Sequence, residues 1–127
     1  MPVTCDEPRA SIARLMAAAF VNMFLIVVTA YFLVKRTHGP SWDPSRLRRE
    51  QDDWDAHAAF MDRLVDEGFV VLGGPVGEGD GHYALQVVEA ESEAEVRARL
   101  ADDPWGEDML VTQSIEPWAI WLRRSPG

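Results

Sequence analysis

The stretch Gly68-Phe-Val-Val-Leu-Gly-Gly-Pro75, followed by His82-Tyr-Ala-Leu-Gln-Val-Val-Glu89, predicts a β-hairpin in the middle of this chain. Residues 69–72 are aromatic and β-branched, as a short strand should be. Gly73-Gly74-Pro75 is expected to break that strand, and the glycines of 77–81 predict a flexible turn. Residues 82–89 then alternate between two faces, which is typical of the returning strand.

Helical patterns flank this hairpin on both sides. Ser45 is expected to cap a long helix that runs to about Glu67 and ends at Gly68. After the hairpin, Ser92 followed by Glu95 forms a capping-box sequence, which predicts a shorter second helix.

Strands complete the pattern at the two ends. Residues 31–37 predict the first strand and 118–123 the last, with 109–115 expected to be a short strand or a bend. The resulting order, β-α-β-β-α-β, is that of the ferredoxin-like split βαβ fold. We therefore predict an α+β protein, with two helices covering one face of a four-stranded antiparallel sheet.

The other face of this sheet is expected to meet a second subunit. Tyr83 and Leu85 point to one side of their strand, and Ala84 and Val88 to the other. A sheet face open to water should instead alternate apolar with polar residues. Two apolar faces therefore predict a homodimer through the sheet.

Composition narrows the function classes. The 127 residues carry 21 acidic and 12 basic side chains, for a net charge of −9, which argues against nucleic acid as a partner. The densest basic group, Arg46, Arg48 and Arg49, is followed at once by acids and is expected to form a solvated helix face. The single cysteine, Cys5, allows no disulfide framework, and a cytoplasmic location is expected.

The N-terminal part of the chain leaves two alternatives. Residues 15–34 form a 20-residue apolar run, long enough to cross a bilayer and so to tether the protein to a membrane. The favoured alternative is a helix-forming segment at 11–20 fused to a β-rich segment at 24–34, because the fold needs 31–37 as a strand. Met23 could also be the true start of translation.

His57 is the strongest candidate for chemistry. At helical spacing it falls on an apolar face together with Trp54, Met61, Leu64 and Val65. An inward histidine needs partners for its ring nitrogens, and a carboxylate partner would also fix its tautomer and strengthen it as a base. Asp103 is the expected partner and Asp102 its rival. The pair is either a general acid–base pair or a purely structural contact.

Further residues are candidates for contact with a small-molecule substrate: Trp42, Gly74, Pro75, Trp105 and Arg36. The tryptophans can wall an aromatic ring, although core packing is the alternative. Gly74 and Pro75 can border a pocket or form a plain bulge, and Arg36 can pair with an anion or lie on the surface. The three histidines have no ligand spacing, so neither a metal nor a cofactor is expected.

Several segments occur in an order that resembles the YCII-related family of small dimeric α+β barrel proteins: Tyr31-Phe-Leu-Val34, Gly39-Pro40, His57 to Leu64, Gly68 to Pro75, Asp103-Pro-Trp105 and Glu116-Pro-Trp118. The resemblance spans about 31–123. It makes 1–28 an N-terminal extension, 29–123 a YCII-related domain and 124–127 a tail. The Asp-Gly-Pro-Phe signature of one subgroup is absent.

The resemblance implies a ferredoxin-like unit that pairs sheet to sheet, with His57 and Asp103 in the active site. Most members of the family have no known reaction. One branch removes chloride from chlorinated hydroxyhydroquinones, and the wider superfamily includes muconolactone isomerases. The expected function is thus lyase- or isomerase-like chemistry on an aromatic or lactone substrate. The alternative is a non-catalytic dimer that binds a small ligand or is only structural.

Overall fold

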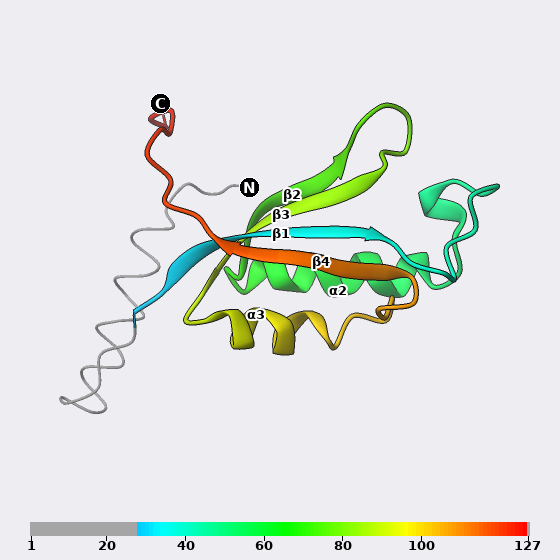
Figure 1. Ribbon diagram of the computed structural model, residues 1–127, viewed down its shortest axis with the longest axis horizontal. Coiled ribbons are helices and arrows are strands. Elements are labelled where there is room, and N and C mark those ends of the chain that lie inside the picture. Colours follow the sequence, from blue (N-terminus) through cyan, green and yellow to red (C-terminus); the bar gives the residue numbers. More distant parts are fainter. Residues whose placement is uncertain (1–27, 127) are drawn as a thin grey trace.

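The computed structural model describes residues 28–126 of the chain. It contains four strands, two α-helices and one 3₁₀ turn (Figure 1). In chain order these are β1 (Ala30–His38), η1 (Arg48–Glu50), α2 (Trp54–Asp66), β2 (Val70–Val76), β3 (Tyr83–Ala90), α3 (Glu93–Leu100) and β4 (Leu110–Pro117).

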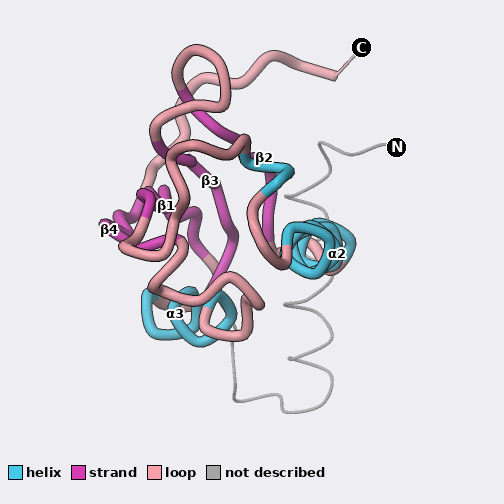
Figure 2. The backbone as a smooth tube through the Cα atoms, turned by 90° about the vertical axis from the view of Figure 1, so that its right-hand side faces the viewer, coloured by secondary structure: helices cyan, strands magenta, loops and turns pink. Residues whose placement is uncertain are grey.

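The strands form one antiparallel sheet in the order β2-β3-β1-β4. Both helices lie on the same side of this sheet (Figures 1 and 2). The predicted α+β class and ferredoxin-like arrangement are confirmed. The first strand, β1, pairs with the last strand, β4. Residues that are far apart in the sequence can therefore meet at one site.

The core lies between the sheet and the helices. Along β1, Phe32 and Val34 are buried and face this layer, while their neighbours are only half-buried. They pack with a cluster drawn from both helices and from β3, which includes Phe60, Leu64, Val88, Val96 and Leu100. Period-two burial in the strand and period-four burial in the helices thus meet in one apolar layer.

The long helix begins later than predicted. Residues 45–53 are not helical apart from η1, and α2 starts at Trp54. Asp53 has φ 62°, in the left-handed region, which interrupts any helix continuing from Ser45. The Gln51 amide holds the preceding loop closed by donating to the carbonyl oxygens of Asp43 and Arg46. Tertiary hydrogen bonds therefore override the helical pattern here.

The break predicted at Gly73-Gly74-Pro75 is wrong, because β2 continues through it to Val76. β2 is an edge strand, and an edge strand tolerates a proline that donates no hydrogen bond. Gly73 has a packing reason of its own: a Cβ there would come within 2.8 Å of the Leu85 carbonyl oxygen. The segment is a closely packed strand end and not a turn.

The last strand is also displaced from its predicted position. β4 is Leu110–Pro117, and residues 118–126 form no strand. Pro117 pairs with Phe32, and the Trp118 amide still donates to the Tyr31 carbonyl. β1 begins at Ala30, so a strand at 118–123 would have almost no neighbour to pair with. The strand predicted at 118–123 from its β-forming side chains is therefore wrong.

Within residues 28–126, no helix is long and apolar enough to cross a membrane. Most of the apolar run at 15–34, and most of the N-terminal extension, lie outside the described residues. Residues 30–34 belong to β1.

The predicted cap of the second helix is confirmed, and it gives a test of local stability. Ser92 Oγ accepts the Glu95 amide at 3.1 Å, and the Glu95 carboxylate accepts the Glu91 amide at 2.7 Å. We expect Ser92→Ala to lower the free energy of unfolding by about 1 kcal/mol, measured by urea denaturation, because an amide loses its acceptor. Ser92→Asp retains an acceptor and should stay near wild type, and equal losses in both variants would contradict this role.

Candidate active site

His57 is buried on the inner face of α2, as its helical spacing predicted. Its Nδ1 lies 2.8 Å from Asp103 Oδ1 and 3.0 Å from Oδ2. Asp103 follows α3 in the turn that leads to β4, so this contact joins the two helical segments. A carboxylate on Nδ1 favours the tautomer with the proton on that nitrogen, and leaves Nε2 as the acceptor.

Asp103 is held by more than His57. Arg36 Nη1 donates to Asp103 Oδ2 at 2.8 Å, and the Trp105 amide donates to Oδ1 at 2.8 Å. Burial disfavours the charged carboxylate, but the hydrogen bonds and charges of His57 and Arg36 outweigh it. The pKa of Asp103 is therefore lowered from its ordinary value. Asp103 is thus an ionised hub between a guanidinium and an imidazole.

Arg36 is 1 % exposed, so the surface alternative for this residue is wrong. It lies on β1 on the same face as Val34, in the layer beneath the helices. Arg36 forms an ion pair with Asp103. Direct contact of Arg36 with a substrate stays a prediction.

Trp105 forms the back of the site. Its ring stacks on His57, with centroids 4.1 Å apart and planes 12° apart, and its Nε1 donates to the Asp52 carbonyl at 2.6 Å. Trp42 meets Trp105 edge-on at 5.5 Å and stacks on His38 at 3.8 Å. Neither tryptophan lines the pocket described below. Their contact with a substrate therefore stays a prediction. Trp105 packs against the ring of His57, and Trp42 packs against Trp105.

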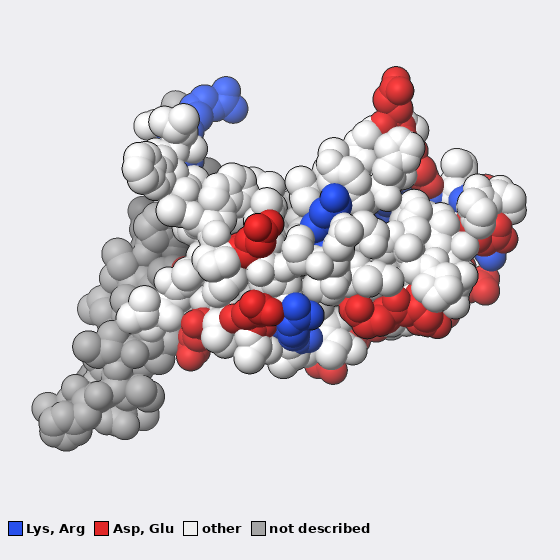
Figure 3. Space-filling view, viewed as in Figure 1, with Lys and Arg blue, Asp and Glu red and all other residues white. Residues whose placement is uncertain are grey.

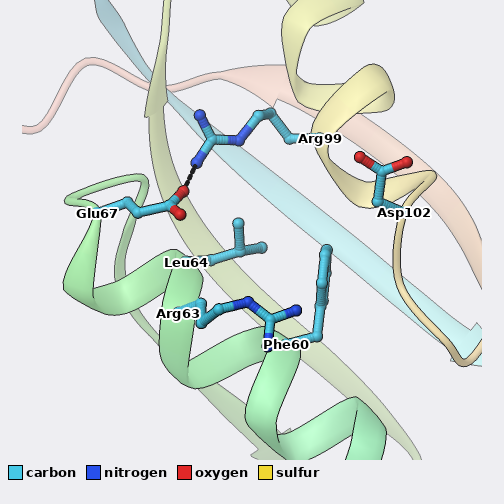
Figure 4. Close-up of a pocket in the computed structure, with 6 residues that line it drawn as sticks. All are labelled: Phe60, Arg63, Leu64, Glu67, Arg99 and Asp102. Atoms are coloured by element: carbon cyan, nitrogen blue, oxygen red, sulfur yellow. Dashed lines mark hydrogen bonds and ion pairs between the residues drawn. The ribbon is translucent and has the colours of Figure 1, made fainter.

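Asp102, the rival partner, is exposed and lies elsewhere (Figure 4). It borders a groove of about 250 Å³ between α2 and α3 that also holds Leu64 and the ion pair of Glu67 with Arg99. Of these two adjacent aspartates, Asp102 is therefore exposed to solvent and Asp103 is buried against His57.

A larger pocket of about 450 Å³ opens on the other side of α2, between that helix and β2. Its size suits a compound of one or two rings. His57 contributes to its wall, as do the predicted residues Gly74 and Pro75. Apolar side chains make up most of the remaining lining, chiefly Trp54, Met61, Val65, Val70, Leu72 and Leu110.

Three polar residues of this pocket were not predicted: Asp62, which is exposed, and Arg48 and Gln86, which are buried. Arg48 was expected on a solvated helix face but is 8 % exposed, because its segment folds inward as η1. Gln86 is 6 % exposed and lies in the middle of β3. The sequence carried a signal for Gln86, because it shares a strand face with Ala84 and Val88 and is the polar exception there. For Arg48 the sequence carried none.

On the face drawn in Figure 3, Lys and Arg side chains are scattered and do not gather into one patch. Among residues 28–126, no group of three or more His, Cys, Asp or Glu side chains could hold a metal ion. The side chains that converge on one place are those of His57, Asp103 and Arg36.

Fold and site together define a small ferredoxin-like α+β protein with a buried imidazole–carboxylate pair beside an apolar pocket. The YCII-related domain matches residues 35–119, so the chain belongs to the YCII-related family. No curated protein matches the chain.

One solved structure is similar: 5-chloro-2-hydroxyhydroquinone dehydrochlorinase from Burkholderia phenoliruptrix AC1100, in complex with 2,5-dihydroxybenzoquinone. The identity is 26 % and the TM-score 0.53, over 70 % of this chain and 93 % of the other.

The buried hub predicts a specific stability loss. Asp103→Asn should lower the free energy of unfolding by about 3–5 kcal/mol, because it leaves the Arg36 guanidinium buried without its counter-charge. Asp102→Asn, at the exposed neighbour, should change it by less than about 0.5 kcal/mol. Chemical denaturation of both variants measures the difference, and similar losses would contradict the hub.

The same hub predicts a pH dependence. The folded pKa of Asp103 lies below the ordinary value of 3.8, so its stabilisation is complete above that value and is lost as pH falls through the folded pKa. Denaturation of the wild type between about pH 5 and pH 2 should therefore show stability falling with pH, and Asp103→Asn should show a shallower fall.

Proposed function

We propose that this protein is a small-molecule enzyme in which His57 and Asp103 act as a general acid–base pair. The substrate is an aromatic, quinonoid or lactone ring, and the reaction is lyase- or isomerase-like. The observation that carries this proposal is the difference between the two ring nitrogens of His57. Nδ1 is committed to Asp103, while Nε2 has no hydrogen-bond partner among residues 28–126 and belongs to a side chain that lines the pocket.

The surroundings of the ring support this role. Stacking on Trp105 and the hydrogen bond to Asp103 leave the imidazole plane little freedom, so the ring is oriented before a substrate arrives. The ionised Asp103 stabilises the imidazolium that forms when Nε2 takes a proton. Burial of both side chains strengthens these charge interactions, because little solvent screens them.

The chemistry depends on proton transfer to and from Nε2. His57 removes a proton from a ring hydroxyl, and the electron pair left behind forms a carbonyl as the ring electrons shift. In the lyase-like case the imidazolium returns this proton to the ring carbon that bears the leaving group, and loss of a second hydroxyl proton then expels the leaving group with its bonding electrons. The net change is loss of H–X, so no external oxidant is needed. In the isomerase-like case the imidazolium returns the proton to another ring atom.

The solved neighbour supports the substrate class. It is a dehydrochlorinase named for a chlorinated hydroxyhydroquinone and holds a dihydroxybenzoquinone. An elimination from a hydroxylated ring is the kind of reaction that an acid–base pair at an apolar pocket can serve. At 26 % identity this likeness supports a class of substrate and not a particular compound.

The proposal is tested by a turnover screen of chlorinated hydroquinones and lactones. For any compound converted, His57→Ala should lower kcat by about 10²-fold or more, the usual contribution of a general base. His82→Ala, at an exposed histidine outside the pocket, should retain the wild-type rate. A His57→Ala rate equal to wild type would remove His57 from the mechanism. Binding without turnover across the screen would instead favour the non-catalytic ligand-binding dimer.

We also propose that the chain forms a homodimer through the face of the sheet that the helices leave open. Tyr31 and Leu33 lie on this face of β1, and both are half-buried in the single chain. Leu85 lies on the same face of β3, opposite Lys35 of β1. The resemblance to sheet-to-sheet dimers supports a second copy of this chain as the occupant.

Light scattering after size exclusion tests this assembly. The wild type should elute at twice the mass of the chain, and Leu33→Glu should shift it toward the monomer, because the substitution puts a charge into an apolar interface. Leu47→Glu, at a position 61 % exposed and off the sheet, is the matched control and should remain dimeric. A monomeric wild type would overturn the assembly.

A further inference from the structure

Arg48 is a buried cation that the proposed acid–base chemistry does not use. It lines the same pocket as His57, from η1, and forms no ion pair among residues 28–126. Its Nη2 donates to the Asp80 carbonyl at 3.2 Å, and its Nε is buried without a partner. The Asp80 carboxylate accepts the Arg48 backbone amide instead of the guanidinium. The guanidinium also lies over the Trp42 ring, 5.1 Å from its centroid.

Arg36 provides an internal comparison. Both arginines are nine-tenths buried or more, but Arg36 has the Asp103 carboxylate at 2.8 Å. A buried cation without such a partner is costly, and an opposite charge compensates for it best. Burial lowers the pKa of Arg48, and the nearby Asp80 only partly opposes this effect. The guanidinium still keeps its proton under ordinary conditions.

Gln86 repeats this pattern on the sheet side of the pocket. It lies in the middle of β3 and lines the pocket, and its Oε1 is buried with no hydrogen-bond partner. A buried amide without partners costs free energy, so such groups usually meet a partner. Besides His57, these two are the buried polar side chains of a largely apolar pocket. The one carboxylate in the lining, that of Asp62, is exposed to solvent.

We infer that Arg48 and Gln86 are the ligand-selecting residues of this pocket. Arg48 binds an ionised oxygen of a flat ring, and Gln86 binds a second polar substituent such as a hydroxyl. The preferred ligand is therefore an anionic, hydroxylated ring compound and not a neutral lactone or ether. This inference rests on the proposed site and narrows its substrate class. His57 carries the proton, and Arg48 selects the charge.

Binding calorimetry with a matched pair of probes tests the inference. 2,5-Dihydroxybenzoquinone ionises readily, whereas 2,5-dimethoxybenzoquinone has the same ring and no acidic hydroxyl. The wild type should bind the dihydroxy compound about ten-fold or more tightly than the dimethoxy compound. Arg48→Met should abolish this preference and leave the affinity for the dimethoxy compound within about two-fold.

Further variants separate lost charge from lost structure. Arg48→Lys keeps the positive charge and should retain most of the preference. Arg49→Met, at the exposed neighbour in η1, should bind both probes like the wild type. Gln86→Leu should weaken binding of the dihydroxy compound by about five-fold, the worth of one hydrogen bond.

The outcomes distinguish this inference from the proposed function. An Arg48→Met variant that still prefers the ionised probe, or a wild type that binds neither probe, would overturn the inference. His57→Ala should keep the charge preference even though its turnover falls, because charge selection belongs to Arg48. Turnover that depends on His57 but shows no preference for the ionised probe would support the enzyme proposal and contradict the proposed role of Arg48.

Discussion

The carboxylate of Asp103 is the point on which the rest of this site depends. It accepts from Arg36 of β1, from His57 of α2 and from the Trp105 amide, and so ties the sheet, one helix and the loop before β4 together. These contacts keep Asp103 charged in spite of its burial. The same atoms therefore serve folding and chemistry, since whatever orients the imidazole also holds the layers of the domain in place.

Local chemistry in the sequence predicted much of this frame. The hairpin, the Ser92 cap and the inward position of His57 each follow from residue types at fixed spacing, and all three are present. Strand pairing depends instead on which neighbours are available, and for that reason β4 was placed too late in the chain. The start of α2 was missed because Asp53 adopts a left-handed conformation that side-chain periodicity does not report.

The candidate site was also predictable only in part. Asp102 and Asp103 are chemically identical neighbours, and only the path of the turn after α3 decides which of them reaches His57. Arg36 could have been predicted as buried, because it shares a strand face with Phe32 and Val34. The inward position of Arg48 depends on the fold of a loop whose local sequence resembles a helix, so the pattern of charges pointed the wrong way.

The left-handed residue Asp53 has one more consequence. It separates η1, which carries Arg48, from α2, which carries His57, so the two groups belong to independent pieces of backbone. Changes of sequence in the segment 43–50, between the Trp42 and Asp52 that contact Trp105, can therefore re-aim the guanidinium while the imidazole stays where the helix holds it. Such an arrangement lets the ligand preference of this scaffold be altered while its proton-transfer groups remain the same.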